Sequence, residues 1–67
     1  MLSARNQVSG QIKAVKLGAV AAEVVISAGG IELVAAITRD SVERMKLAAG
    51  DQVTAVIKAS DVIIAKD

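Results

Sequence analysis

The sequence predicts a single all-β domain of 67 residues that contains one short α-helix. Three observations support this fold class. Apolar and polar residues alternate over several segments of strand length. Glycines separate these segments. One segment, residues 39–47, instead places apolar side chains at helical spacing. A chain of this length accommodates one domain at most, and we therefore treat residues 1–67 as one unit.

The first predicted strand is long and irregular. Apolar residues alternate with polar ones through residues 8–12, and the alternation resumes in the opposite phase at Val15 and Leu17. A slip of phase within one strand is typical of a β-bulge, which places an extra residue on one side of a strand pair. The sequence therefore predicts a bulge near residues 13–14, with Gly18 ending the strand.

The next two strands are predicted to form a hairpin. Residues 19–27 and 31–38 are rich in Ala, Val, Ile and Leu, and the sequence AGG at 28–30 separates them. A short glycine-containing connection between two such runs is typical of a tight hairpin turn.

Residues 39–47 predict a short helix of about two turns, judged from helical start and stop signals. Val42 and Met45 are spaced to share one helix face. Asp40 is predicted to cap the N-terminus, because Glu43 follows three residues later as in a capping box. Gly50 is the predicted terminator.

Two further strands complete the predicted fold. Residues 51–59 alternate cleanly, with Val53, Ala55 and Ile57 on one face, and residues 60–67 predict a short fifth strand. Five strands with a helix between the third and the fourth resemble the small oligonucleotide/oligosaccharide-binding (OB) barrel. The predicted architecture is thus a five-stranded OB-like barrel.

The composition predicts a subunit that associates with copies of itself. Hydrophobic residues make up 54% of the chain, yet it contains no Phe, Tyr or Trp. A chain this small needs disulfides, a metal or oligomerisation to be stable, and Cys and His are both absent. Both faces of the predicted strands are apolar, as Val24 beside Val25 and Leu33 beside Val34 illustrate. The outward face therefore needs cover, which partner subunits would provide.

The residue inventory argues against several classes of function. Without His or Cys, a catalytic base or nucleophile is hard to assemble, and we expect no enzyme. The lack of aromatic residues and a net charge of +1 argue against binding of single-stranded nucleic acid. Neither a membrane-spanning run nor a signal-peptide pattern is evident, so we expect a cytoplasmic protein without a membrane partner.

An oxyanion site can be assembled from the polar residues. Arg5 offers a planar fork of donors, and Ser3 and nearby amides add neutral ones. Thr38 and Ser41 flank the start of the predicted helix, where free amides favour an anion. Lys58 lies on the outward face of the fourth strand, close to Ser60.

Each of these residues also has an ordinary structural explanation. Thr38 and Ser41 can simply cap the helix, with Asp40 between them repelling an anion. Lys58 and Arg5 can be solvated surface charges.

Two segments closely resemble the molbindins, a family of small molybdate-binding proteins whose domain also occurs in molybdate-responsive regulators and as the TOBE domain of molybdate importers. They are SARNQ at 3–7 and AAITRDSVERMKLAAGDQVTAVIKASDVIIAKD at 35–67. The resemblance implies an OB-like barrel assembled as a homo-hexamer, a trimer of dimers, which binds molybdate and tungstate at subunit junctions. It implies no direct protein ligand to the metal and no further cofactor.

The resemblance also implies which residues hold the oxyanion. Carried onto this sequence, the residues that bind through their side chains are Ser3, Arg5, Thr38, Ser41 and Lys58, with Ser60 alongside. Ala4 and Ala59 bind through their backbones, and Asn6 is expected to fix the conformation of its segment. Relatives often carry a basic residue shortly after SARNQ, where this chain has Ser9, which puts a second class of sites in doubt.

The leading hypothesis is non-enzymatic molybdate binding for intracellular molybdenum storage or homeostasis. The alternative is a structural oligomerisation module without a physiological anion.

Overall fold

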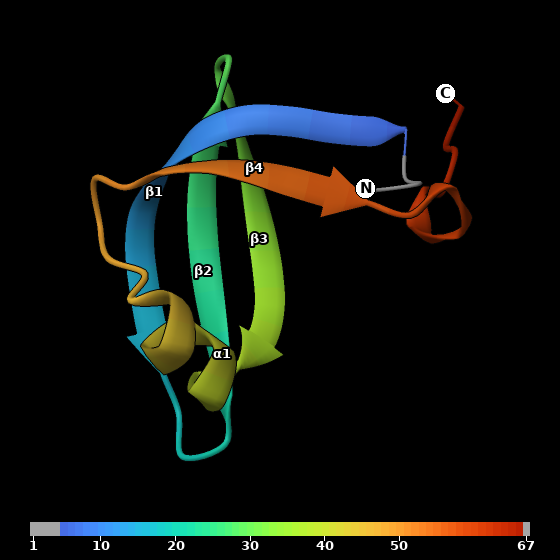
Figure 1. The fold of residues 1–67 in the computed structure, drawn as a ribbon. Coiled ribbons are helices and arrows are strands. Elements are labelled where there is room, and N and C mark those ends of the chain that lie inside the picture. Colours follow the sequence, from blue (N-terminus) through green and yellow to red (C-terminus); the bar gives the residue numbers. More distant parts are fainter. Residues whose placement is uncertain (1–4, 67) are drawn as a thin grey trace.

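A computed structural model describes residues 5–66. Within this range four strands form one antiparallel sheet in the order β3-β2-β1-β4, with an α-helix between β3 and β4 (Figure 1). The elements are β1 (Asn6–Leu17), β2 (Ala21–Ala28), β3 (Ile31–Thr38), α1 (Arg39–Met45), β4 (Gln52–Ile57) and the 3-10 helix η1 (Ala59–Asp61). The predicted β-rich fold with one helix before the fourth strand is confirmed.

Strand β1 bends and belongs to two strand pairs. Its first half pairs with β4 and its second half with β2, and the register shifts between Ile12 and Ala14. The predicted bulge is therefore confirmed. The loop before β4 is joined to this bend, because Gly50 donates its N–H to the carbonyl of Ile12 and Ile12 donates to the carbonyl of Asp51. The bend carries the β1–β4 ribbon across the β2–β3 hairpin (Figure 1).

The β2–β3 hairpin closes at Gly29 and Gly30. Ala28 pairs with Ile31, and both glycines have positive φ, 55° and 86°. Glycine adopts this backbone conformation without the steric cost that a Cβ would bring. The third strand has the predicted bounds, whereas the second runs from residue 21 to 28 rather than 19 to 27.

The helix begins at Arg39, as the predicted range has it, but the predicted cap and terminator are both wrong. Thr38, not Asp40, is the N-cap, and its hydroxyl oxygen accepts the Ser41 N–H. Asp40 lies within the helix and forms an ion pair with Arg44. At the other end Lys46 adopts the left-handed conformation, φ 53° and ψ 45°, and stops the helix before Gly50. A left-handed residue commonly ends helices, and here a non-glycine residue supplies it.

The predicted fifth strand is not formed by this chain on its own. Residues 59–61 form η1, residues 62–66 are in no strand, and Asp67 lies outside the described residues. The fourth strand accordingly ends at Ile57, earlier than predicted. The sheet of the described residues therefore ends at β3 and β4, and no barrel is closed. Apolar sequence predicts burial, but a strand also needs a neighbouring edge with which to pair.

The core lies between β1, β2 and α1. The buried hydrophobic residues of the described chain are Ile12, Ala22, Val24, Ile26, Ala28 and Val42. Val42 is the buried residue of α1, and Met45 remains 59% exposed. Outward-facing Val34 and Val56 are 61% and 43% exposed, so the second apolar face predicted from sequence has no cover within one chain.

We predict that Gly10→Ala destabilises the fold. A Cβ at Gly10 would lie 2.6 Å from the Ser27 carbonyl oxygen and 2.7 Å from Ile26 Cγ2, because β1 crosses β2 closely there. Overpacking of this kind costs about 1–3 kcal/mol of unfolding free energy. Chemical denaturation should show this loss, with Ser9→Ala on the exposed neighbouring position as the matched control. Equal stability of the two variants would contradict the close approach.

Candidate functional site

Two cations of the predicted site lie at the tip of the β1–β4 ribbon. Asn6 pairs with Ile57 at the last register position of the two strands. Arg5 directly precedes Asn6, and Lys58 directly follows Ile57, so both residues lie at this end of the ribbon, just beyond the last paired residues. Both are exposed, whereas Asn6 is partly buried. Two positive groups at one exposed position are suited to a dianion.

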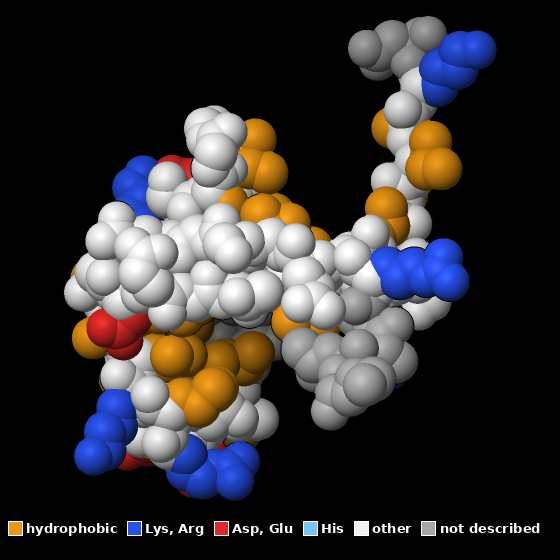
Figure 2. All heavy atoms as spheres, turned by 45° about the horizontal axis from the view of Figure 1, so that its top comes forward, with side chains coloured by type: hydrophobic (Ala, Val, Ile, Leu, Met, Phe, Trp, Pro, Cys, Tyr) orange, Lys and Arg blue, Asp and Glu red, His pale blue; other side chains and the backbone are white. Residues whose placement is uncertain are grey.

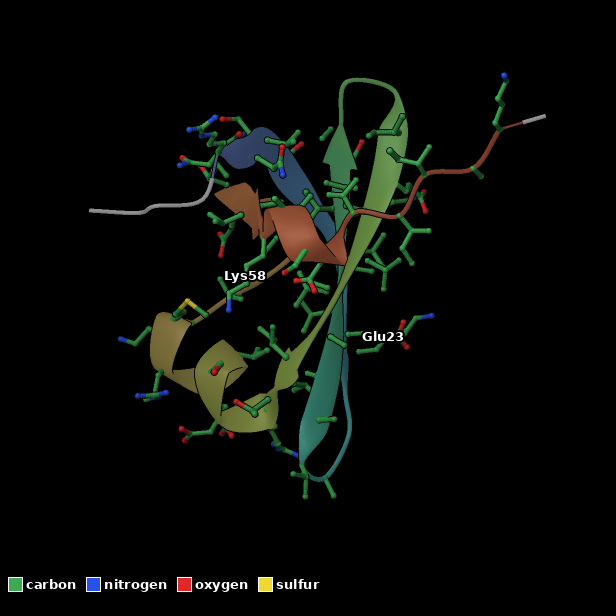
Figure 3. The ribbon with its side chains drawn as sticks, turned by 90° about the vertical axis from the view of Figure 1, so that its right-hand side faces the viewer. Glu23 and Lys58 are labelled. Carbon is green, nitrogen blue, oxygen red and sulfur yellow. The ribbon has the colours of Figure 1, made fainter. Side chains whose placement is uncertain are left out.

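Backbone donors of η1 follow Lys58. Lys58 is the N-cap of η1, and no side chain caps that end. Ala59 and Ser60, both exposed, are the first residues of this helix, where N–H groups have no intrahelical acceptor. In Figure 3 the Lys58 side chain extends toward the side on which α1 lies, while Glu23 points away on the other side of the sheet. The carboxylate of Glu23 is thus turned away from Lys58.

Thr38 and Ser41 form a second polar group at the start of α1. Thr38 Oγ1 accepts the Ser41 N–H at 3.0 Å and donates to Ser41 Oγ at 2.8 Å. The hydroxyl hydrogen of Thr38 is therefore used within the cap. Ser41 accepts this bond, and a hydroxyl that accepts can still donate its own hydrogen. Of the two, Ser41 is the better placed to donate to a ligand, and Thr38 chiefly holds the helix start.

The charges around this helix start are paired. Arg44 Nε lies 3.0 Å from the Asp40 carboxylate, which offsets the negative charge that the sequence placed between Thr38 and Ser41. Arg39 is not among the predicted site residues, but it lies at this helix start. Its Nε donates to Glu43 at 3.3 Å and its Nη1 to the carbonyl of Gly18 at 3.3 Å. The four-residue spacing from Arg39 to Glu43 is the signal that indicates this helical pair.

The two polar groups lie at different ends of the chain. Thr38 pairs with Ala21 at the end of β3 and leads into α1, whereas Lys58 follows the far end of β4 (Figure 1). The structure therefore joins Thr38 to Ser41 by hydrogen bonds and places Arg5 and Lys58 at the same end of the β1–β4 ribbon, but it does not bring these two groups together within one chain. Ser3 and Ala4 lie outside the described residues.

Asp61 is a charged residue close to Lys58 along the chain, because it lies in η1 and its N–H donates to the Lys58 carbonyl. Lys13 and Glu32 form an exposed ion pair beside the β2–β3 turn; their hydrogen bond and opposite charges raise the pKa of Lys13 and lower that of Glu32. Residues 5–66 contain no group of three or more His, Cys, Asp or Glu side chains that could hold a metal ion. Over the same range, no helix has the length and apolar character to cross a membrane.

Comparison with known proteins identifies similar chains over nearly the full length. The sequence profile of the TOBE domain family matches residues 2–64. Molybdenum-pterin-binding protein 3 of Clostridium pasteurianum is 48% identical over 64 residues, which cover 94% of each chain.

Solved structures have the same fold. A molybdate-binding protein from Sporomusa ovata superposes with a TM-score of 0.95 at 42% identity, covering 98% of both chains. The cytoplasmic molybdate-binding protein ModG, in a form with molybdate bound, has a TM-score of 0.89 at 44% identity, over 94% of this chain and 45% of ModG.

We predict that alanine substitutions at Thr38 and at Ser41 lower the stability of the protein by different amounts. Thr38→Ala removes the N-cap acceptor and should lower the unfolding free energy by about 1 kcal/mol, whereas Thr38→Ser retains the hydroxyl. Ser41→Ala removes a hydroxyl whose loss leaves the cap bond to the Ser41 N–H in place, and should change stability less. Denaturant titration of the three variants tests this order. A loss for Ser41→Ala that exceeds that of Thr38→Ala would contradict the assigned roles.

Proposed function

This chain belongs to the TOBE domain family, and on that premise we propose that it binds molybdate, and tungstate with it, as the free oxyanion. The protein acts without catalysis, in intracellular molybdenum storage or homeostasis in the cytoplasm. The relatives named for molybdate or molybdenum-pterin binding support the ligand class. The observation that carries the proposal for this chain is that Arg5 and Lys58, both exposed, lie at the same end of the β1–β4 ribbon.

The chemistry of a tetrahedral dianion suits this tip. Desolvation of such an ion costs free energy unless each of its oxygens gains hydrogen-bond donors and its charge is compensated. Arg5 supplies a bidentate donor fork and Lys58 a point charge. Amides at the start of η1 and the backbone of the SARN segment supply neutral donors. With a net charge of +1, the chain attracts anions through this local placement rather than through its overall field.

We place the site at a junction between copies of the chain. Arg5 and Lys58 are exposed in one chain, and Thr38 and Ser41 lie at a distant end of the same chain. A second copy that presents its helix start to the ribbon tip would unite the two polar groups and exclude water. The uncovered apolar face that includes Val34 and Val56 supports self-association. A hexamer built as a trimer of dimers is the assembly we propose.

A structural oligomerisation module remains the competing function. It shares the exposed apolar faces with the proposed function but assigns no ligand to Arg5 and Lys58. Calorimetry distinguishes the two functions, because the structural module binds no anion.

We predict that molybdate binding depends on both ribbon-tip cations. Titration calorimetry should detect heat with molybdate, and Arg5→Ala or Lys58→Ala should each weaken affinity by about tenfold or more, as expected for loss of a charged hydrogen bond. Phosphate serves as the comparison anion.

The control variant for this titration is Lys16→Ala, which removes an exposed cation of β1 away from the tip. It should retain the affinity of the unchanged protein. Absence of heat with molybdate, or equal weakening by all three substitutions, would refute the proposed site.

We predict further that the protein is not a monomer. Light scattering after size exclusion should give a mass several times 6.8 kDa, because the apolar face has no cover in one chain. The Arg5→Ala variant should keep this mass, since it removes a ligand contact rather than apolar surface. A mass of one chain at micromolar concentration would contradict self-association.

A further inference from the structure

The helix α1 is short and buries little of its surface. It has seven residues, and a helix of this length has little stability of its own in water. Val42 is its buried residue, whereas Met45 is 59% exposed. One buried side chain fixes where the helix lies but does not prevent it from turning about that point. Contacts away from Val42 are therefore needed to fix the orientation of α1.

Arg39, the first residue of α1, connects the helix to the β1–β2 turn, residues 18–20. Its backbone N–H donates to the carbonyl of Val20 at 2.8 Å, and its Nη1 donates to the carbonyl of Gly18 at 3.3 Å. The turn is itself closed by the Gly18 N–H, which donates to the carbonyl of Ala21 at 2.8 Å. The turn and α1 lie at the same end of the sheet (Figure 1). The start of the helix is thus attached to an ordered part of the β1–β2 pair.

The same side chain also holds the helix one turn further on. Arg39 Nε donates to Glu43 Oε1 at 3.3 Å, four residues later in the sequence. A guanidinium is a rigid planar fork, so bonds from two of its nitrogens fix its plane as well as its position. We call this arrangement of Arg39, Glu43 and the Gly18 carbonyl the helix clamp.

The helix clamp and Ser41 lie on opposite sides of α1. Each residue of an α-helix turns the chain by about 100°, so residues two apart are separated by about 200° around the axis. Ser41 is two residues from Arg39 and two from Glu43. An anion that accepts from the Ser41 hydroxyl would therefore meet the side of the helix that faces away from the clamp.

The charge of Arg39 is opposed by the carboxylate of Glu43. On the face of the protein shown in Figure 2, Lys and Arg side chains are scattered, and several lie beside an acidic side chain, rather than forming one basic patch. An effect of Arg39 on anion binding would therefore come from the position that it gives to the helix and not from attraction.

We propose that Arg39 is a positioning residue for the oxyanion site, which fixes through the helix clamp the direction in which the Ser41 hydroxyl donates. Thr38, the residue before Arg39, donates to Ser41 Oγ at 2.8 Å and leaves Ser41 its own hydrogen for a ligand. A shift of the helix start by about 1 Å would stretch a hydrogen bond of about 2.9 Å beyond its useful range. This inference rests on the proposed function and adds to it a residue that does not touch the ligand.

A double-mutant cycle with Ser41 tests this role by titration calorimetry with molybdate. Arg39→Ala alone should weaken the affinity by about three- to tenfold. In a protein that already carries Ser41→Ala, the same substitution should weaken it by no more than about twofold, because no hydroxyl is left to position. Equal weakening in the two backgrounds, or an unchanged affinity for Arg39→Ala alone, overturns the proposal.

The control for lost charge is Lys16→Ala, which also removes one exposed cation. It should retain the affinity of the unchanged protein. A loss equal to that of Arg39→Ala would assign the effect to charge and overturn the proposal.

Glu43 offers a second comparison in which the change of charge is the same for both variants. Glu43→Gln and Glu43→Ala each remove one negative charge, but Gln keeps an amide oxygen that can accept from Arg39 Nε. Glu43→Gln should therefore bind molybdate about threefold more tightly than Glu43→Ala. The difference should vanish when Arg39→Ala is also present. Equal affinities of the two Glu43 variants overturn the proposal.

Light scattering of the same samples shows whether the assembly persists. Each variant should keep the mass of the unchanged protein, because none removes apolar surface. A fall in mass for Arg39→Ala overturns the proposal, since the clamp would then act on assembly and not on the Ser41 hydroxyl. Absence of molybdate heat from the unchanged protein would refute the proposed function itself. Heat from the unchanged protein together with equal losses in the cycle would refute the role of Arg39 alone.

Discussion

A four-stranded sheet made from small aliphatic side chains cannot enclose its own core, and this constraint shapes the whole molecule. The buried residues that the structure describes lie where β1 and β2 meet α1, and the inner faces of β3 and β4 stay partly exposed. A larger aromatic side chain could have filled that space, but the sequence has none. Burial is the main favourable term in folding, so the remaining apolar surface favours contact with another molecule.

The bend in β1 connects the core to the candidate site. The bulge after Ile12 and the close crossing at Gly10 let one strand pair with β2 and then with β4. The ribbon formed in this way extends beyond the hairpin and ends at Asn6 and Ile57. The residues that hold the ribbon in place, such as Gln11 and Gly50, are therefore distant from Arg5 and Lys58 but determine where they lie.

Much of the fold follows from local sequence. The bulge, the Gly29–Gly30 turn and the alternation in β4 are determined by neighbouring residues, and each was predicted correctly.

The helix cap was missed because Thr38 and Asp40 are both good capping residues, and the end of β3 decides between them. A fifth strand was predicted over residues 60–67 but is not formed, because pairing depends on an edge that the isolated chain does not offer to residues 62–66. For the candidate site, strand register accounts for Arg5 and Lys58 lying at the same end of the ribbon, and the ligand-binding role of these residues stays a prediction. Contacts between copies are not encoded by spacing along one chain.

The placement of two cations, Arg5 and Lys58, at one end of the β1–β4 ribbon has a thermodynamic consequence. An anion held at this end of the ribbon would be attracted by both positive charges. In an assembly whose seam contains this tip, ion uptake and subunit cohesion are linked equilibria, and each strengthens the other by the same free energy. Dilution of the protein then favours release of the ion, and abundance of the ion favours the larger particle.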